Sequence, residues 1–115
     1  MSATGSARLV IVAYRPRAGQ AEALAAAVHR HGPVLRAEGL VTERPFTVMQ
    51  AGDGTLVEVF EWTSAAAIEA AHANPRVQAL WAEFFAACEY VPIASVAESG
   101  QLFSEFTPRD DLVLA

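Results

Sequence analysis

Residues 45–62, PFTVMQAGDGTLVEVFEW, decide the fold of this chain. Two stretches rich in β-branched and aromatic residues, 45–51 and 55–62, flank Gly52, Asp53 and Gly54. An Asp-Gly pair between two such stretches is typical of a β-hairpin, whose turn needs a residue with positive φ. The sequence therefore predicts two antiparallel strands joined by a tight turn.

Upstream of this hairpin, residues 8–14, RLVIVAY, predict a further strand that is apolar on both faces. A strand of this kind expects cover on both sides. An alanine-rich segment follows from about residue 20 and ends at Gly39, with one apolar stripe at helical spacing: Leu24, Val28, His31 and Leu35. Because Pro33 removes a backbone donor inside this helix, we expect a kink or a break at Gly32 and Pro33.

Downstream of the hairpin, a helix is predicted from Ser64, with a pause at Asn74 and Pro75. Asn74 suits the N-cap of the second piece and Pro75 its first helical position. The second piece carries a continuous apolar face before Pro92 closes it: Val77, Leu80, Trp81, Phe84, Phe85 and Cys88. Residues 101–107, QLFSEFT, alternate as a last strand would, and the tail after Pro108 is expected to be an arm or disordered.

The predicted order is strand, helix, strand, strand, helix, strand. This order indicates a single α+β domain over residues 1–115, with its core at about 8–107. The expected architecture is a ferredoxin-like βαββαβ fold, in which two helices cover one face of a four-stranded antiparallel sheet. Since the other face is also apolar, we expect a homodimer in which two sheets pack together.

Composition narrows the possible functions. With 53% apolar and 18% charged residues, the chain is not intrinsically disordered. A net charge of -5 argues against nucleic acid and anionic membranes as partners. No apolar run is long enough to span a membrane and the start lacks a signal-peptide pattern, so a soluble cytoplasmic protein is expected. The single cysteine, the lack of zinc-type spacing and the lack of a glycine-rich phosphate loop predict neither a metal nor a nucleotide cofactor.

The stretch VEVFEWTSAAAIEAAHANPRVQALWAEF, residues 57–84, carries a family resemblance. It resembles the hairpin strand and second helix of antibiotic biosynthesis monooxygenase-like domains, which belong to the dimeric α+β barrel superfamily. The most specific features are Trp62 at the strand end, the helix start at Ser64 and the break at Asn74, and the resemblance covers residues 8–107. It implies a dimeric α+β barrel, whose relatives include oxygenases, isomerases, haem degraders and decarboxylases.

The resemblance also implies particular site positions. Members that oxidise aromatic polyketides without a cofactor line their pocket with an asparagine, a tryptophan and a tyrosine. Those positions fall on Glu58, Trp62 and Ile68 here, so one of the three is retained. The tryptophan and axial histidine of haem-degrading members fall on Ala71 and Trp81, and without that histidine haem degradation is not expected.

Two residues are candidate catalytic bases. Glu58 shares its strand face with Leu56, Phe60 and Trp62, where a carboxylate is costly unless it is paired and could act on a phenol or an acidic carbon. The alternative is an ion pair with Arg15 or Arg44. His72 shares a stripe with Ile68, so it either moves protons near neutral pH or is a buried histidine bonded to a carbonyl.

Six residues are candidate contacts for a small aromatic or hydrophobic ligand: Trp62, Tyr14, Ile68, Trp81, Phe85 and His31. Each also has an alternative as core, and His31 could bond a carbonyl freed by Pro33. The leading hypothesis is a cofactor-independent monooxygenase-like protein acting on a phenolic, polyketide- or quinol-type substrate. The alternatives are a ligand-binding or accessory protein without turnover, and an isomerase, cyclase or decarboxylase that does not use oxygen.

Overall fold

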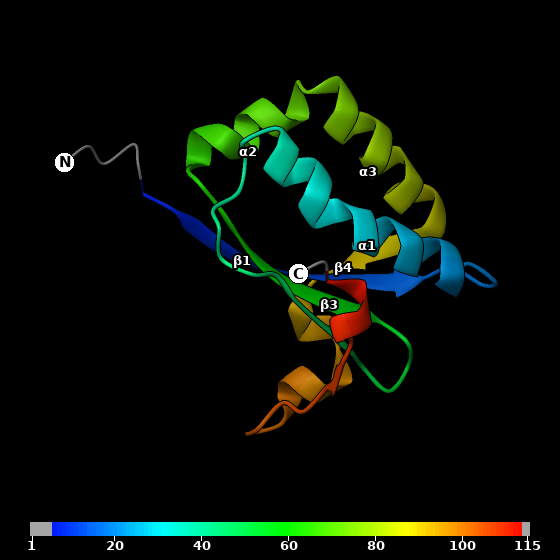
Figure 1. Ribbon diagram of the computed structural model, residues 1–115. Helices are drawn as coiled ribbons and strands as arrows, with labels where there is room; N and C mark the ends of the chain where they lie inside the picture. Colours follow the sequence, from blue (N-terminus) through cyan, green and yellow to red (C-terminus); the bar gives the residue numbers. More distant parts are fainter. Residues whose placement is uncertain (1–5, 114–115) are drawn as a thin grey trace.

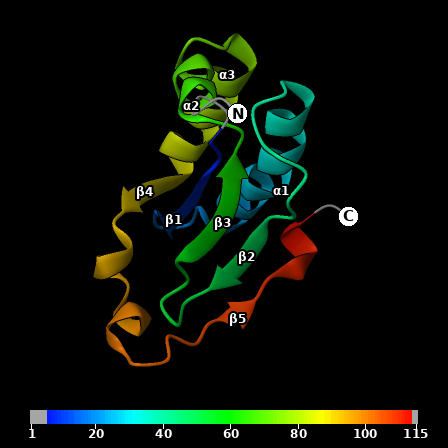
Figure 2. The same cartoon turned by 90° about the vertical axis from the view of Figure 1, so that its left-hand side faces the viewer.

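The computed structural model describes residues 6–113, which form an α+β fold (Figure 1). Strands β4, β1, β3, β2 and β5 make one antiparallel sheet in that order, and the three helices lie on one face of it (Figure 2). The strands are β1 (Arg8–Pro16), β2 (Thr47–Gln50), β3 (Leu56–Trp62), β4 (Cys88–Val91) and β5 (Thr107–Pro108). The helices are α1 (Ala21–Ala37), α2 (Ala65–His72) and α3 (Pro75–Ala87), with three short 3-10 turns, Ile93–Ser95, Ala97–Gly100 and Asp110–Leu112.

The predicted hairpin is confirmed as β2 and β3. Its turn needs positive φ at Gly54, which has a φ of 94°, and the Asp53 side chain accepts a hydrogen bond from the backbone N–H of Thr55 at 2.9 Å. The hairpin places β3 in the centre of the sheet, between β2 and β1. Every second residue of β3 therefore faces the helices.

Helix α1 buries the predicted stripe of Leu24, Val28, His31 and Leu35. A kink or a break was expected at Gly32 and Pro33; the break is wrong, because α1 continues through both residues to Ala37. A proline removes a single backbone donor, whereas the stripe on both sides of it is buried against one sheet. That shared burial keeps the helix in one piece.

The pause between α2 and α3 is confirmed. The Asn74 side chain accepts hydrogen bonds from the backbone N–H groups of Arg76 at 2.9 Å and Val77 at 3.2 Å, with Pro75 in the first turn. Ser64 caps α2 in the same way, accepting from the Ala67 N–H at 3.1 Å. These caps direct the two helices along different lines above the sheet (Figure 1).

The expected count of four strands and two helices is wrong near the C-terminus. The segment expected to end a helix, Cys88–Val91, is instead strand β4, which pairs with β1. The strand expected over 101–107 is mostly an exposed loop, and within it only Thr107 joins the sheet, as the first residue of β5. The tail then turns back, where Leu112 is buried in the core; residues 114–115 lie outside the described residues.

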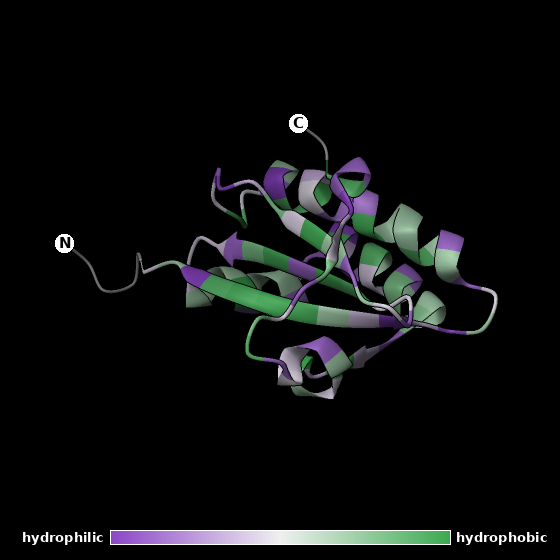
Figure 3. Cartoon of the chain, turned by 90° about the horizontal axis from the view of Figure 1, so that it is seen from below, coloured by the Kyte–Doolittle hydropathy of each residue, from purple (hydrophilic) through white to green (hydrophobic). Residues whose placement is uncertain are grey.

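The face of the sheet opposite the helices is partly covered by the chain itself. Val96 packs there with Ala13, Ala51 and Val57. Leu9 and Ile11 on the same face remain 57% and 47% exposed, and Figure 3 shows the apolar stretch of β1 on this side. The chain's own residues thus cover only one end of this face of the sheet. Within residues 6–113, no helix has the length and hydropathy needed to cross a membrane.

Candidate functional site

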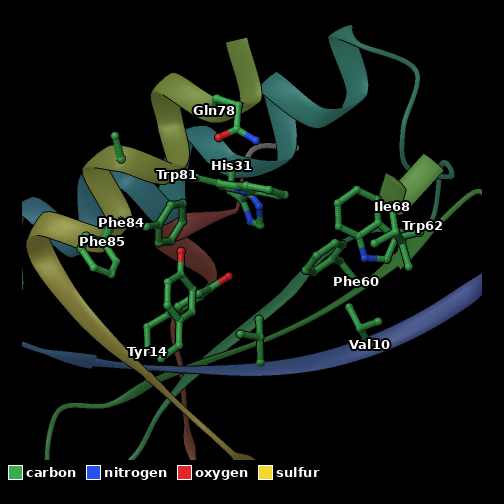
Figure 4. Close-up of a pocket in the computed structure, with 13 residues that line it drawn as sticks. Val10, Tyr14, His31, Phe60, Trp62, Ile68, Gln78, Trp81, Phe84 and Phe85 are labelled. Carbon is green, nitrogen blue, oxygen red and sulfur yellow. The ribbon is translucent and has the colours of Figure 1, made fainter. Parts of the chain in front are cut away.

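A pocket of about 660 Å³ lies between the helices and the sheet (Figure 4). Volumes of this size accommodate drug-sized molecules. Its lining comes from six elements: Val10, Val12 and Tyr14 of β1, His31 of α1, Phe60 and Trp62 of β3, Ile68 of α2, Gln78, Trp81, Ala82, Phe84 and Phe85 of α3, and Tyr90 of β4. All six predicted ligand contacts are among these residues.

The walls of the pocket are mainly aromatic. The predicted apolar face of α3 divides into two parts: Val77, Leu80 and Phe84 are buried, whereas Trp81 is half-buried and Phe85 is 69% exposed. Trp81 and Phe85 therefore form the wall and rim rather than core. No arginine and no carboxylate is among the described residues that line the pocket, so its chemistry favours a flat, uncharged guest.

Glu58 lies beneath the pocket floor and is completely buried. One carboxylate oxygen, Oε1, accepts a hydrogen bond from the Tyr14 hydroxyl at 2.6 Å and lies 2.8 Å from Nδ1 of His31. The sheet register explains the first contact: Tyr14 is paired with Leu56, so Glu58 is its diagonal neighbour on the same face. His31 reaches the same oxygen from α1 above.

This network corrects two sequence-based alternatives. Glu58 does not pair with Arg15 or Arg44, which instead approach Asp53 at 3.9 Å and Glu61 at 3.2 Å. His31 does not bond a carbonyl freed by Pro33, because its Nδ1 meets Glu58. The buried carboxyl group of Glu58 is thus contacted by two polar side chains, Tyr14 and His31, and both of them line the pocket.

His72, the second predicted base, is placed elsewhere. Its side chain is exposed at the end of α2, where Nδ1 lies 2.9 Å from the carbonyl of Ile68. The ring meets Trp81 edge-on, with 5.0 Å between centroids. His72 therefore lies behind a wall residue of the pocket and not with Glu58.

Glu58 also lines a separate small cavity. Oε2 has no hydrogen-bond partner among residues 6–113. The cavity measures about 10 Å³, near the size that one water needs. It is bounded by α1 and by the C-terminal turn, including His29 and Leu112. Glu58 therefore lines this small cavity but not the large pocket.

Both tyrosines of the chain are held in the neutral form. Burial raises the pKa of Tyr14 well above its ordinary value, with further contributions from the charge of Glu58 and from the hydrogen bond to it. Burial, with the nearby Cys88 and Glu58, raises the pKa of Tyr90 to about 12. Neither phenol is therefore ionised in the folded protein near neutral pH.

A pH titration of tyrosinate absorbance checks this arrangement. The chain has two tyrosines, and we expect little tyrosinate in the folded protein at the ordinary tyrosine pKa of about 10. Since both folded-state pKa values are raised, the associated stability is fully present below about pH 10 and is lost as the pH rises further. Half-ionisation of both tyrosines near pH 10, in protein whose circular dichroism is still native, would contradict the buried position of Tyr14 beside Glu58.

Sequence reasoning did not propose Gln78 or Tyr90 as site residues. Gln78 lies at the top of the pocket (Figure 4), and its amide donates to the carbonyl of His72 at 2.6 Å. Tyr90 was missed because β4 was not predicted. Tyr90 is paired with Tyr14 across β1 and β4, and this pairing would have indicated a place in the site. It can be recognised only once β4 is known to be a strand. Phe60 was noted only as a neighbour of Glu58 on the same strand face.

Comparisons of this chain with models of known protein families, with curated proteins and with solved structures find no significant match.

Proposed function

We propose that this protein is a cofactor-independent monooxygenase-like protein that acts on a small aromatic, phenolic substrate of polyketide or quinol type. One observation carries the proposal: a pocket of about 660 Å³ with aromatic walls has a buried network of acid–base groups directly at its floor. Apolar walls favour a flat guest, and perturbed ionisable groups at a pocket are typical of reactive sites. The family resemblance agrees with this proposal.

The proposed reaction has two stages. First the Tyr14, Glu58 and His31 network removes a proton from an acidic O–H or C–H group, which leaves an electron-rich anion. The anion then passes electrons to dioxygen, and the overall conversion of a CH₂ group to C=O consumes one O₂ and releases one water. Trp62 and Trp81 hold the ring system during both stages. Dioxygen is the oxidant, so no further electron acceptor is needed.

We also propose a homodimer with the ferredoxin-like, dimeric α+β barrel arrangement. Leu9 and Ile11 leave an apolar strip of the sheet exposed, and a second copy of the same face would cover it. The packing of two sheets would close the side of the molecule opposite the pocket. It leaves the ligand space between sheet and helices free.

A second candidate is a ligand-binding or accessory protein with the same pocket and no turnover. The observation in its favour is that two of the three site positions implied by the resemblance, Glu58 and Ile68, differ from the oxygenase pattern. An isomerase or cyclase that uses the same base without oxygen is a related alternative. All three require the same guest, so they differ only in what happens after binding.

Oxygen uptake separates these functions. With a panel of anthrones, quinols and polyphenols, we expect protein-dependent oxygen consumption that falls at least 10-fold in Trp62→Ala. The matched control is Phe103→Ala, at a residue that is 77% exposed and outside the pocket, which should keep the uptake unchanged.

The other outcomes identify the alternatives. Protection against thermal unfolding without turnover would favour the binding protein. Product formation under strict anaerobiosis would favour the isomerase or cyclase. If no compound in the panel turns over or stabilises the fold, the proposed function is wrong.

A further inference from the structure

We propose that His31 is the general base of this pocket, and that Glu58 is a positioning residue that acts through it on a substrate with one acidic O–H group. This inference rests on the proposed function and names the group that removes the proton in the first stage of the reaction. It differs from the sequence-based expectation, which placed the base at Glu58 or His72.

Glu58 is excluded as the direct base by its position. Its side chain is completely buried and is not part of the pocket lining. Its Oε1 already accepts a hydrogen bond from Tyr14 and lies 2.8 Å from Nδ1 of His31, and the one cavity that Glu58 is found to line is the small one. A substrate proton therefore reaches Glu58 only through a residue that touches both the carboxylate and the pocket.

Tyr14 and His31 are the two residues that meet both conditions. The Tyr14 hydroxyl donates a hydrogen bond to Glu58, and its raised pKa keeps the hydroxyl neutral and able to donate. It fixes the carboxylate but does not accept a proton from a guest. This elimination leaves His31.

The geometry prepares His31 for this role. In the proposed site Glu58 is a carboxylate, which only accepts hydrogen bonds; Nδ1 of His31, at 2.8 Å from its Oε1, then carries the proton. The lone pair is then on Nε2, the nitrogen left for a guest in the pocket that His31 lines. The rings of Phe60 and Phe84 pack edge-on against the imidazole at 5.2 and 5.1 Å between centroids, which fixes its orientation.

The proton transfer balances without a co-reactant. The substrate O–H bond breaks, a bond forms between the proton and Nε2, and the electron pair stays on the substrate oxygen. The imidazolium that results lies against the Glu58 carboxylate, so the new positive charge is neutralised where it forms. The total charge of the site is unchanged, because a neutral guest and a carboxylate become an anionic guest and an ion pair.

The test uses a coloured phenol and its methyl ether. 2-Hydroxyanthraquinone is flat and changes its visible absorption on ionisation, and 2-methoxyanthraquinone has nearly the same shape without the acidic proton. At a pH one unit below the phenol's own pKa in water, we expect the bound phenol to absorb as the phenolate. We expect His31→Gln to abolish this ionisation and Glu58→Gln to reduce the ratio of bound phenolate to bound phenol at least 10-fold. Both variants should still bind the ether.

His29→Gln is the matched control, because His29 is on the same helix but lines only the small cavity. It should leave the ionisation unchanged. If both compounds bind to the unaltered protein and the phenol remains neutral, His31 is not the base, but the pocket is still a binding site for flat aromatic ligands. If neither compound binds, the proposed function fails together with this inference.

A second measurement needs neither ligand nor variant. Long-range ¹H–¹⁵N spectra of the histidine side chains give the tautomer of each neutral imidazole. We expect neutral His31 to carry its proton on Nδ1 and its lone pair on Nε2. The opposite tautomer would overturn the inference on its own, whether or not any phenol binds and whether or not the substituted proteins fold.

Discussion

Replacing Phe84 with alanine is expected to lower the free energy of unfolding by about 3–5 kcal/mol. Phe84 is 1% exposed and its ring packs against Tyr14 at 4.9 Å and His31 at 5.1 Å between centroids. Since domains of this size are stable by only about 5–15 kcal/mol, the variant loses a large part of its stability. The space left by the ring joins the pocket, so collapse of neighbouring side chains recovers little of the loss.

The adjacent residue supplies the control. Phe85 is on the same helix but is 69% exposed, at the pocket rim, so Phe85→Ala should change stability by less than about 1 kcal/mol. The same variant is expected to weaken binding of 2-methoxyanthraquinone, because it removes part of the rim. Urea unfolding followed by circular dichroism, at one protein concentration, measures both stabilities. Equal losses in the two variants would contradict the division of α3 into a core face and a pocket face.

This pair of phenylalanines shows what sequence alone could predict. Helical spacing placed both residues on one apolar face, and that much is correct. It could not tell which half of the face meets the sheet and which meets the pocket, because that depends on how the helix is rotated above β1. The periodicity of apolar residues shows which face of the helix is apolar, whereas tertiary packing decides which residues of that face are buried.

The hairpin was predictable because its signals are local. The turn residues around Gly54 and the β-branched and aromatic residues on both sides of them agree with each other without reference to any other part of the chain. Cys88–Val91 is the opposite case. A short apolar stretch after a helix fits a last helical turn as well as a strand, and pairing with the edge of β1 decides in favour of the strand.

The candidate site was predictable in its list of residues but not in its connections. Glu58 was singled out because a carboxylate on an apolar strand face needs a partner, and the structure supplies Tyr14 and His31. The expected partners were arginines, chosen by charge. Sequence separations of 44 and 27 residues carry no local signal of these contacts. Only the strand register and the path of α1 bring the three side chains together.

The exposed apolar strip of Leu9 and Ile11, on the face of the sheet opposite the helices, is the basis for a prediction about dimerisation. Ile11 is paired with Val59 across β1 and β3 on the face that the helices do not cover. Ile11 is 47% exposed and Leu9 57%. The segment around Val96 covers the other end of this face. If a second copy covers the remaining strip, Ile11 lies in the interface. In a twofold-symmetric dimer each subunit contributes its own Ile11 to that interface.

Ile11→Glu is therefore expected to weaken dimerisation at least 100-fold, because each dimer would have to bury two carboxylates among apolar side chains. Ala79→Glu makes the same charge change on the exposed surface of α3, outside both the pocket and the strip, and should leave the dimer intact. Sedimentation across a range of micromolar concentrations measures the mass of both variants and of the unaltered protein. We expect twice the chain mass for the unaltered protein and for Ala79→Glu, and the chain mass for Ile11→Glu with an unchanged circular dichroism spectrum. A monomeric unaltered protein would contradict the proposed dimer, and a dimer that survives Ile11→Glu would place the interface on another surface.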